Sequence, residues 1–475
     1  MLLTVIQQEF RLVRRDATWI ALAALVFIAA LAAVNGAQRS KVRVAETAGL
    51  VAAEREMTEA VQRRAGALPA NSAAPAPATS LPGALGWSIL SQMAVLPAEP
   101  LAPLAVGQSD LHPSFYVVTA HEPHTFMNGG AIANSLALAT GSFDLAFVMV
   151  FVMPIFVIAM VYDLLSRERE RGTLALAAAH GISVLRFSLA RCCARTCLML
   201  LVVNVVSVVA FVVSGIDWGA PGAFSTAVLW MLMTSFYAIF WFATALVVNA
   251  WPRSSDSNGV VMANVWLVLV VVMPALLNIA ATTLYPAPSR VELTTELREA
   301  ATIAEEQAAQ AREDFFFDHP DLVSIDQDPE IYFREVQRSE AQIAAALAPL
   351  LSEFDSAAGR RAELVNWLQY LSPAIVAQRV FAQLAGTDEA RFDQFRRQVV
   401  GFHAQYQQFF AIPLAAGATM SGEQLGTRPA FEFAAHRASW SDFALPFGSL
   451  LMTTLALIAF AFPRLSRYPV TPEAA

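Results

Sequence analysis

The residues best suited to chemistry lie in one charged run between two apolar stretches. The run reads S-R-E-R-E-R-G-T-L, and its candidate contact residues are Glu168, Glu170, Gly172, Thr173 and Leu174. Its carboxylates and hydroxyl can accept hydrogen bonds from another protein. Apolar residues follow the Gly-Thr break, so we predict a short helix across a membrane face that could dock a cytoplasmic partner. The simpler interpretation is a charged stop after a membrane span.

Two histidines give a weak indication of a metal site. The segment H-E-P-H contains His121 and His124 with a methionine nearby, and histidine and methionine suit copper. The proline inside the pair and a setting that looks disordered in sequence favour an ordinary surface loop instead. The cysteines lie together at the start of one apolar stretch, at Cys192, Cys193 and Cys197. They have no histidine nearby, so we predict no zinc site and no cofactor bound by this chain.

The sequence argues against catalysis by this chain and predicts no catalytic residue. Ion-coupled carriers place charged residues deep inside their spans, and none occurs there away from the ends of the apolar stretches. The chain has one lysine, Lys41, outside any G-K-S/T motif, so it has no standard P-loop. The polar residues inside the spans could bond between helices or line a translocation path. They include Asn204, Thr234, Asn264 and Asn278.

Composition places most of these residues in a membrane. The chain is 56% hydrophobic and 15% charged, whereas a soluble protein has about 25% charged residues. A membrane-spanning helix needs about 20 mostly apolar residues. Six predicted spans satisfy this requirement, at 18–35, 143–165, 196–214, 223–248, 260–284 and 443–462. The first could be a signal peptide, but the sequence after it is a poor cleavage site, so we interpret it as an anchor.

Basic residues predict the orientation of the spans. Arginines fill the loop at 166–195 and occur in the tail at 463–475, and short loops rich in arginine stay in the cytoplasm. Both termini are therefore predicted to be cytoplasmic. The long segments 36–142 and 285–442 then lie outside the cytoplasm. Residues 1–17 are amphipathic, which predicts a helix in the membrane interface or, more simply, an ordinary leader.

The two outer segments differ in character. The first is partly Ala/Pro-rich between Ala65 and Pro103, and we expect that part to be extended or loosely ordered. The second shows helical patterning, including a stripe with spacings of three and four that favours a core over a ligand surface. The stripe consists of Phe392, Phe395, Val399, Phe402, Tyr406 and Phe409. We predict an all-α integral membrane protein with six transmembrane helices and a mainly helical extracytoplasmic domain between spans five and six.

Several motifs resemble one family of membrane proteins. The pattern E-x-E-x-G-T-L at 168–174 resembles that of ABC-2 type transporter permeases. The segments G-S-F-D-L-A-F at 141–147 and D-H-P-D-L at 318–322 resemble the DUF3526 branch, grouped with multi-copper-enzyme-maturation type permeases. The pair S-P at 372–373, followed by L-A-G-T-D at 384–388, resembles the same branch.

Some residues depart from the pattern of that family. The branch usually has glutamate where Asp321 stands, which is a mild change. Many ABC-2 permeases place a proline and later a lysine after G-T-L, whereas this chain has H-G-I-S and then Arg191. The arginine keeps the positive charge of the lysine, so the coupling role that the family suggests is retained.

The resemblance implies a transport subunit in a bacterial inner membrane. In such a machine the 168–174 segment forms the coupling helix and contacts a cytoplasmic ABC ATPase, which uses ATP and Mg²⁺ in its own chain. A second permease, identical or paralogous, completes a dimer, and export is the expected direction. The net charge of −8 and the absence of a basic stripe from the sequence argue against a nucleic-acid partner.

Two other functions are compatible with parts of the sequence. A membrane-anchored extracytoplasmic scaffold or sensor for an envelope protein would explain the large outer segments. It would have no need for the E-x-E-x-G-T-L pattern. A membrane enzyme would need a constellation of carboxylate, histidine or cysteine residues near the membrane face, and the candidates Glu168, Glu170 and His180 lack metal-ligand spacing.

Overall fold

The computed structural model describes residues 18–66, 77–107, 109, 112–123, 143–286, 329–435 and 439–470, with scattered positions between 295 and 317. Within these residues, six helical segments are long and apolar enough to cross a membrane. They are Thr18–Ala65, Leu145–Glu170, Val184–Ser214, Ala223–Asn249, Ser255–Leu284 and Trp440–Ser466. The chain is therefore a multi-pass membrane protein, as its composition predicts. The predicted interfacial helix at 1–17 lies outside the described residues.

Helix α11 (Ala223–Asn249) is the central helix of the span bundle. Its large aromatic side chains Trp230, Tyr237 and Trp241 are buried. The helices packed around it include α7 (Met153–Val161), α10 (Val184–Ser214), α16 (Pro373–Ala385) and α19 (Ala444–Ser466). Because α11 is apolar on every side, it can be surrounded by protein, whereas the outer spans keep one face for lipid.

Two spans contain a wider, π-helical turn directly before a Met-Pro pair. Span two consists of α6 (Leu145–Phe147), η5 (Val148–Val152) and α7. Span five consists of α12 (Ser255–Trp266), η6 (Leu267–Val272) and α13 (Met273–Leu284). Proline has no amide hydrogen and its ring clashes with the preceding turn, so a wider turn accommodates Pro154 and Pro274.

Hydroxyl groups from other elements bond to carbonyls in these two wide turns. Tyr237 Oη donates to the Val150 carbonyl at 2.9 Å, four residues before Pro154. Ser372 Oγ donates to the Leu269 carbonyl at 2.7 Å, five residues before Pro274. A carbonyl that faces lipid without a donor costs several kcal/mol, so these hydroxyls stabilise the irregular turns.

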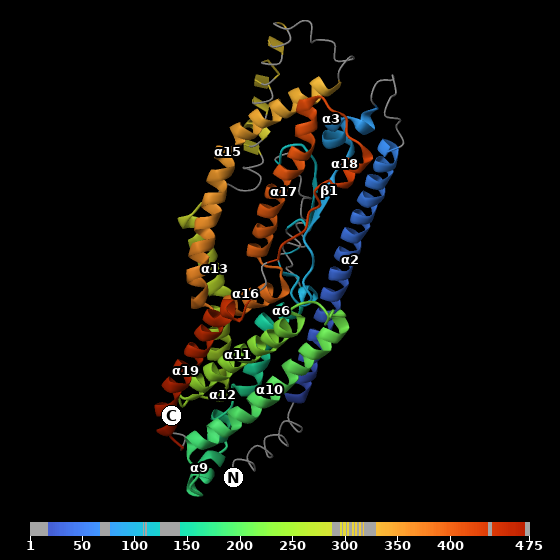
Figure 1. The fold of residues 1–475 in the computed structure, drawn as a ribbon. Coiled ribbons are helices and arrows are strands. Elements are labelled where there is room, and N and C mark those ends of the chain that lie inside the picture. Colours follow the sequence, from blue (N-terminus) through green and yellow to red (C-terminus); the bar gives the residue numbers. More distant parts are fainter. Residues whose placement is uncertain are drawn as a thin grey trace.

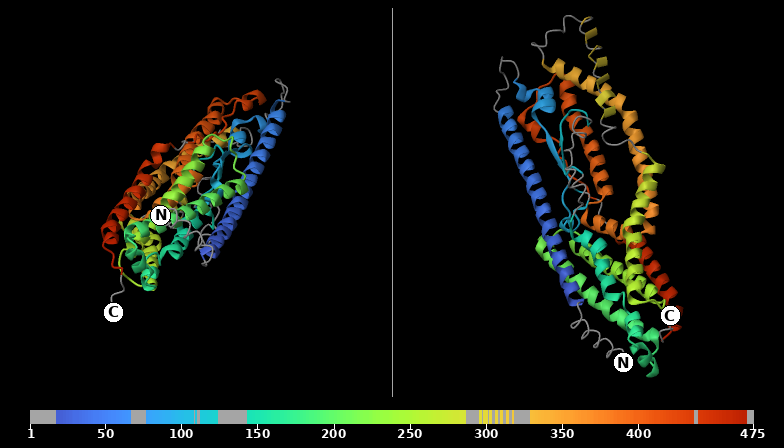
Figure 2. Two further views of the ribbon diagram at one scale, coloured as in Figure 1. Left: turned by 90° about the horizontal axis from the view of Figure 1, so that it is seen from below. Right: turned by 180° about the vertical axis from the view of Figure 1, so that it is seen from behind.

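Helix α2 (Thr18–Gly66) continues without a break far beyond the first span. Its second half, the described residues at 77–107, 109 and 112–123, and residues 329–435 form a part of the molecule that we call the distal domain, at the upper end of Figure 1. The views in Figures 1 and 2 agree that α2 and α15 (Pro329–Leu368) form the two opposite sides of this domain. Helix α17 (Glu389–Ala416) and the strands lie between them.

Within the residues that the structure describes, the distal domain is mainly helical but contains one small sheet. Strands β1 (Gln92–Val95) and β2 (Phe115–Val118) pair antiparallel, with Met93 opposite Val117. The description all-α therefore needs this one correction, since the β-branched and aromatic residues of β2 favour a strand. The short elements of the domain are η1 (Ala78–Ser80), α3 (Pro82–Ala84), η2 (Leu85–Ile89), η3 (Ala102–Leu104), η8 (Gln369–Leu371) and α18 (Gly422–Gly426). The turn η9 (Trp440–Phe443) leads into α19.

The aromatic stripe of α17 forms the core of the distal domain. Phe395, Val399 and Tyr406 are completely buried, and Phe402 is nearly so. They pack with residues of the Ala/Pro-rich segment, including Leu85 and Trp87. The prediction of a core stripe is confirmed. The expectation that the Ala/Pro-rich segment is loosely ordered is wrong for residues 77–103, because their apolar side chains are buried in this core and in the span bundle.

Candidate functional site

The charged run after span two folds into two short helices joined by a glycine. Helix α8 (Ser166–Glu170) ends at Arg171, and α9 (Thr173–Ala179) starts after Gly172. Gly172 has φ +72°, a left-handed conformation that costs other L-residues roughly 1–2 kcal/mol. This turn ends the charged helix α8 and allows the apolar helix α9 to begin directly after it. Both helices lie at the end of the bundle farthest from the distal domain (Figure 1).

Glu168 connects this segment to the start of span three. Its carboxylate accepts a hydrogen bond from Arg191 Nη1 at 3.0 Å, and the Thr173 hydroxyl bonds to the same carboxylate. Arg191 is 3% exposed and also donates to the Leu164 carbonyl at 3.1 Å. A guanidinium that bonds both a carboxylate and a carbonyl fixes the angle between α8 and α10.

Glu170 connects the segment to the start of span five. Its carboxylate accepts a hydrogen bond from the Ser255 amide at 2.7 Å and another from the Ser255 hydroxyl at 3.0 Å. Ser255 is the first residue of α12, where amide groups have no partner within the helix. A carboxylate there also interacts favourably with the helix dipole. Glu170 is thus a cap for a helix that begins 85 residues later in the sequence.

Helix α9 has one face turned into the protein and one turned away. Leu174 is 1% exposed and belongs to the core of the span bundle. Leu176 is 61% exposed, and Ala179 and His180 are also exposed. The residues of the E-x-E-x-G-T-L pattern therefore shape and anchor the segment, and Leu176 is the large side chain that α9 offers to a partner.

The structure brings all five predicted coupling residues into one segment and adds partners that the sequence did not single out. Arg191 was identified only as a basic residue, and Ser255 was not identified. A serine-rich start before an apolar run, S-S-D-S at 254–257, is a helix-start signal that could have indicated α12. The nearby Asp163 also joins two elements, since it lies 3.3 Å from Arg167 and 3.4 Å from Arg195.

The four predicted polar residues of the spans fall into two groups. Asn204 Nδ2 donates to Ser235 Oγ at 3.0 Å, so it bonds between α10 and α11. Thr234 is buried and bonds the Trp230 carbonyl of its own helix. Asn264 and Asn278 are exposed on span five. Asn204 therefore links two spans and Thr234 bonds within its own helix, whereas Asn264 and Asn278 lie on the outer surface of the bundle.

Asn249 is a buried polar residue of the spans that the sequence analysis did not single out. Asn249 is completely buried and donates to the Val161 carbonyl of span two at 3.0 Å. The buried Asn258 of α12 contacts the Asn249 amide oxygen at 3.4 Å. The sequence signal that could have identified Asn249 is its position, a polar amide side chain at the end of the apolar run of span four. This side chain connects spans two, four and five close to the α8 segment.

A second group of motif residues connects the distal domain to the spans. Asp144 accepts a hydrogen bond from the Phe147 amide at 2.8 Å and another from the Gly107 amide at 3.1 Å. Thr387 of the L-A-G-T-D element donates to the Ala105 carbonyl at 2.8 Å. Together with Ser372, these contacts fasten residues 105–107 and α16 to the span bundle. We call this set of contacts the joint.

The predicted weak metal ligand His121 has a different environment. Its ring bonds to the carboxylate of Glu340 on α15, which raises the pKa of His121 above its usual value. The His121 carbonyl bonds His403 Nε2 at 2.7 Å, and burial lowers the pKa of His403. Among the described residues, no three histidine, cysteine or acidic side chains cluster as metal ligands, and His124 lies outside these residues.

Comparison with known proteins gives one match, and it covers part of the distal domain. No curated protein matches the chain. The elements D-H-P-D-L and the first two residues of G-S-F-D-L-A-F lie outside the described residues, whereas S-P and L-A-G-T-D lie at the joint. Residues 290–434, which include α15, α16 and α17, match the family model of a domain of unknown function, DUF3526.

Proposed function

We propose that this chain is the permease subunit of an ABC-2 type transporter in a bacterial inner membrane. A separate cytoplasmic ABC ATPase binds α9 and hydrolyses ATP with Mg²⁺. Both termini are cytoplasmic and the distal domain is outside. The chain catalyses no covalent chemistry and moves a substrate across the membrane, with export as the expected direction.

The observation that carries this proposal is the way α9 is held. Glu168 bonds Arg191 at the start of span three, and Glu170 bonds Ser255 at the start of span five. A force on the exposed face of α9 would therefore reach two spans through charged hydrogen bonds. Such a contiguous connection between a docking helix and the spans is one physical route for energetic coupling to an ATPase.

The charge distribution supports the orientation. The end of the bundle that contains α8 and α9 carries many arginines and the distal ends of the spans carry few. Arginine-rich ends stay in the cytoplasm. These arginines are Arg167, Arg169, Arg171, Arg186, Arg191, Arg195, Arg253, Arg464 and Arg467.

The surface of span five supports a second permease copy or a paralogue as a partner. Within the described part of the chain, span five is the least buried of the six spans. Asn264 and Asn278 are exposed on it, and a polar amide facing lipid is unfavourable. A second permease packed against this face would cover both amides.

The decisive experiment is co-expression of the tagged chain with its neighbouring genes, followed by purification and an assay for a co-purifying ABC ATPase. The test variant is Leu176→Arg, which alters the exposed face of α9 and leaves the anchored face intact. Ile412→Arg in α17 is a matched control, because Ile412 is 62% exposed and Leu176 is 61% exposed. We expect Leu176→Arg to lose the ATPase and Ile412→Arg to retain it.

A further variant separates docking from coupling. Arg191→Gln should still bind the ATPase, while substrate-stimulated ATP hydrolysis falls because span three no longer follows α8. If wild type captures no ATPase, or Leu176→Arg captures as much as wild type, the permease assignment is wrong. The scaffold or sensor function would then explain the large distal domain better.

A further inference from the structure

The segment between spans five and six returns to the span bundle before it forms the core of the distal domain. Helix α15 packs beside α13, and Arg361 of α15 donates to the Tyr285 carbonyl at 3.0 Å, directly after the end of span five. Farther along the chain, Ser372 Oγ donates to the Leu269 carbonyl in the middle of the same span. The end of α15 therefore descends alongside span five, and α16 leads the chain back to the joint.

The bond from Ser372 gives the depth of this turn in the chain. We call residues 364–378 the corner; they comprise the end of α15, η8 and the start of α16. From Ser255, the first residue of span five, to Leu269 the helix rises roughly 21 Å at about 1.5 Å per residue. The hydrocarbon core of a bilayer is about 30 Å thick. Even if that core begins at Ser255, Leu269 lies roughly 9 Å below its surface on the distal side, and a tilted span would place it deeper.

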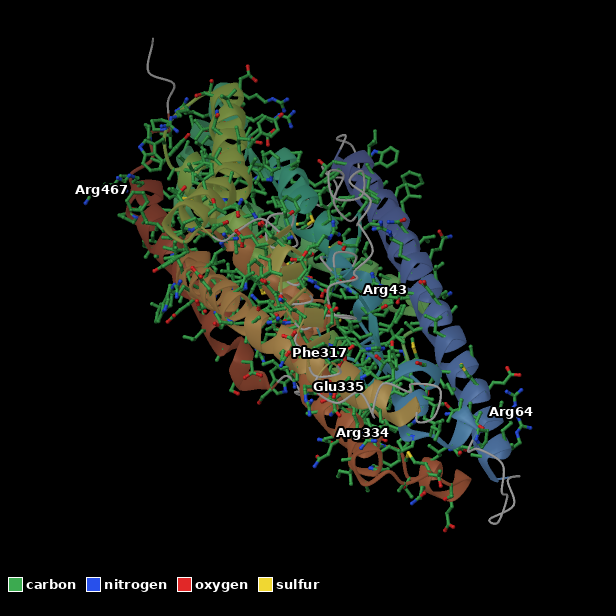
Figure 3. All side chains as sticks on the ribbon, turned by 90° about the horizontal axis from the view of Figure 1, so that it is seen from above. Arg43, Arg64, Phe317, Arg334, Glu335 and Arg467 are labelled. Carbon is green, nitrogen blue, oxygen red and sulfur yellow. The ribbon has the colours of Figure 1, made fainter. Side chains whose placement is uncertain are left out.

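The charges around the corner agree with this depth. No charged residue occurs between Glu363 and Arg379, whereas the far end of α15 is rich in charge, as at Arg334 and Glu335 in Figure 3. Arg379 Nη2 donates to the Asn366 side chain at 2.5 Å and so joins the two arms of the corner. Glu363 lies roughly 13 Å back along α15 from the tip of the corner, which brings it to the level of the lipid head groups.

Polar side chains of the corner have partners inside the protein. Gln369 Nε2 donates to the Asn366 carbonyl at 2.7 Å, the Asn366 side chain accepts from Arg379, and the Ser372 hydroxyl bonds span five. A polar group in hydrocarbon has no water to bond, so partners within the protein are required there. These three side chains meet that requirement.

Two large apolar side chains of the corner face away from the protein. Trp367 is 75% exposed and Leu371 is 54% exposed, and their spacing of four residues places them on one side of the chain. Leu276 and Ile279 of the neighbouring α13 are exposed in the same way on span five. The apolar surface of the corner therefore continues the surface that span five presents to lipid. Tryptophan is also a residue that membrane interfaces favour.

We propose that the corner is inserted in the leaflet on the distal side, where lipid acyl chains cover Trp367 and Leu371. The segment 285–442, which the sequence predicts as an extracytoplasmic domain, then re-enters the membrane and anchors the distal domain beside the joint. Lipid is the partner because the exposed pair lies at hydrocarbon depth and is continuous with a span. The proposal concerns this chain alone and does not depend on an ATPase partner.

Spin labelling measures this depth on the full chain in vesicles of phosphatidylethanolamine and phosphatidylglycerol. A nitroxide is attached at Leu371→Cys after the native cysteines are replaced, as Cys192→Ala, Cys193→Ser and Cys197→Ser. Molecular oxygen concentrates in hydrocarbon, whereas a nickel chelate stays in water. The ratio of their collision rates with the label therefore reports whether the label lies in lipid.

Two other exposed positions serve as references in the same background. Met452→Cys on span six is the reference for lipid, and Ile412→Cys on α17 is the reference for water. We expect the ratio of oxygen to nickel collisions at Leu371→Cys to match that at Met452→Cys. It should exceed the ratio at Ile412→Cys severalfold.

Aspartate substitutions test the same position without a label and with the native cysteines in place. Leu371→Asp should lower the thermal midpoint of the chain in vesicles, because a carboxylate in hydrocarbon is unfavourable. Ile412→Asp is the matched control and should change the midpoint little, since its carboxylate lies in water. Leu371→Ala removes the leucine without adding a charge and should also have a small effect.

Three results would overturn the proposal. Frequent collisions of the Leu371→Cys label with the nickel chelate would place the corner in water. Rare collisions with both reagents would mean that another protein chain, and not lipid, covers Leu371. Equal thermal midpoints for Leu371→Asp and Ile412→Asp would show that position 371 does not lie in hydrocarbon, whatever the labelled chains report.

Discussion

The Glu170 carboxylate accepts a hydrogen bond from the Ser255 amide at 2.7 Å, and this contact joins the loop after span two to the first turn of span five. Ser255 Oγ also donates to Ser166 Oγ at 2.9 Å, so both ends of α8 contact the same residue. A short helix held in this way is tied at both ends to the first residue of α12. This property is what the proposed permease would need to transmit a movement of the ATPase to its spans.

Removing the Glu170 carboxylate should loosen the first turn of α12. In Glu170→Ala the Ser255 amide loses its acceptor and the helix dipole loses a compensating charge, at a cost of about 1 kcal/mol. Hydrogen exchange of the amides at 255–258 should become roughly fivefold faster. Arg171→Ala, which changes an exposed neighbour, is the control and should leave the exchange unchanged. Unchanged exchange in Glu170→Ala would show that Ser254 alone caps the helix.

Ser372 should contribute stability through two bonds at once. Its hydroxyl donates to the Leu269 carbonyl in the wide turn of span five and accepts from the Ile375 amide at the start of α16. We expect Ser372→Ala to lower the free energy of unfolding by about 1–2 kcal/mol. The measurement is a denaturant titration of the detergent-solubilised chain.

Two further variants test the role of Ser372 in the joint. Ser449→Ala is the control, because the Ser449 hydroxyl bonds the Pro446 carbonyl of its own helix. Ser372→Thr keeps the hydroxyl and should recover part of the lost stability. If Ser372→Ala and Ser449→Ala lower the free energy of unfolding equally, the bond between the distal domain and span five adds no more stability than a bond within one helix.

Local patterns were sufficient to predict the elements whose signals lie close together in sequence. The six spans follow from apolar runs, and the stripe of α17 follows from spacings of three and four. Gly172 was predicted to break the charged run, and it supplies the left-handed turn before α9. In each of these cases the physical cause acts within a few residues, so composition and period were enough.

The contacts between distant segments could not be predicted in this way. Glu170 and Ser255 are 85 residues apart, and Thr387 and Ala105 are 282 apart. No periodicity relates such pairs. The Ala/Pro-rich segment was misjudged for the same reason, because its composition does not record that Leu85 and Leu101 are buried against other elements. The family resemblance identified the S-P and L-A-G-T-D elements. It gave no indication that Ser372 and Thr387 of these elements form hydrogen bonds within the joint.

Gly36 should be required for the close approach of α2 to the joint. A Cβ atom at this position would lie 2.0 Å from the Pro103 carbonyl oxygen, which is a backbone atom. Gly36→Ala should therefore lower the free energy of unfolding by roughly 1–3 kcal/mol. Gly49 lies in the same helix with nothing within 4 Å of its Cβ position. Gly49→Ala should stabilise the chain by up to roughly 1 kcal/mol, since alanine favours helix.

The two glycine variants are compared in the same denaturant titration. The free energy of unfolding should fall in Gly36→Ala and rise in Gly49→Ala. Alanine favours the helix at both positions, but only at Gly36 does its Cβ atom clash with another segment. If Gly36→Ala also stabilises the chain, α2 moves away from Pro103 at little cost, and the joint does not depend on that approach.

The pair of His121 and Glu340 should make the distal domain more stable in mild acid. Glu340 raises the pKa of His121, so the folded state holds this proton more tightly than the unfolded state, whose pKa is about 6.5. The added stability is fully present below the unfolded pKa and is lost as pH rises through the raised folded pKa. The other titratable groups facing this site are Glu122 and His403, and burial lowers the pKa of His403. His403 therefore acts in the opposite direction, since its protonation below about pH 6.5 favours the unfolded state.

A comparison with His121→Gln isolates the effect of His121, because His403 is present in both proteins. The thermal midpoint of wild type should exceed that of His121→Gln by more at pH 6 than at pH 9. Glu340→Gln should lose the same pH dependence, since it removes the charge that raises the pKa. A difference between wild type and His121→Gln that stays constant with pH would mean that the pair acts as a neutral hydrogen bond. In that case the segment that contains His121 would be held to α15 with equal strength across this pH range, and acid would act on this site through His403.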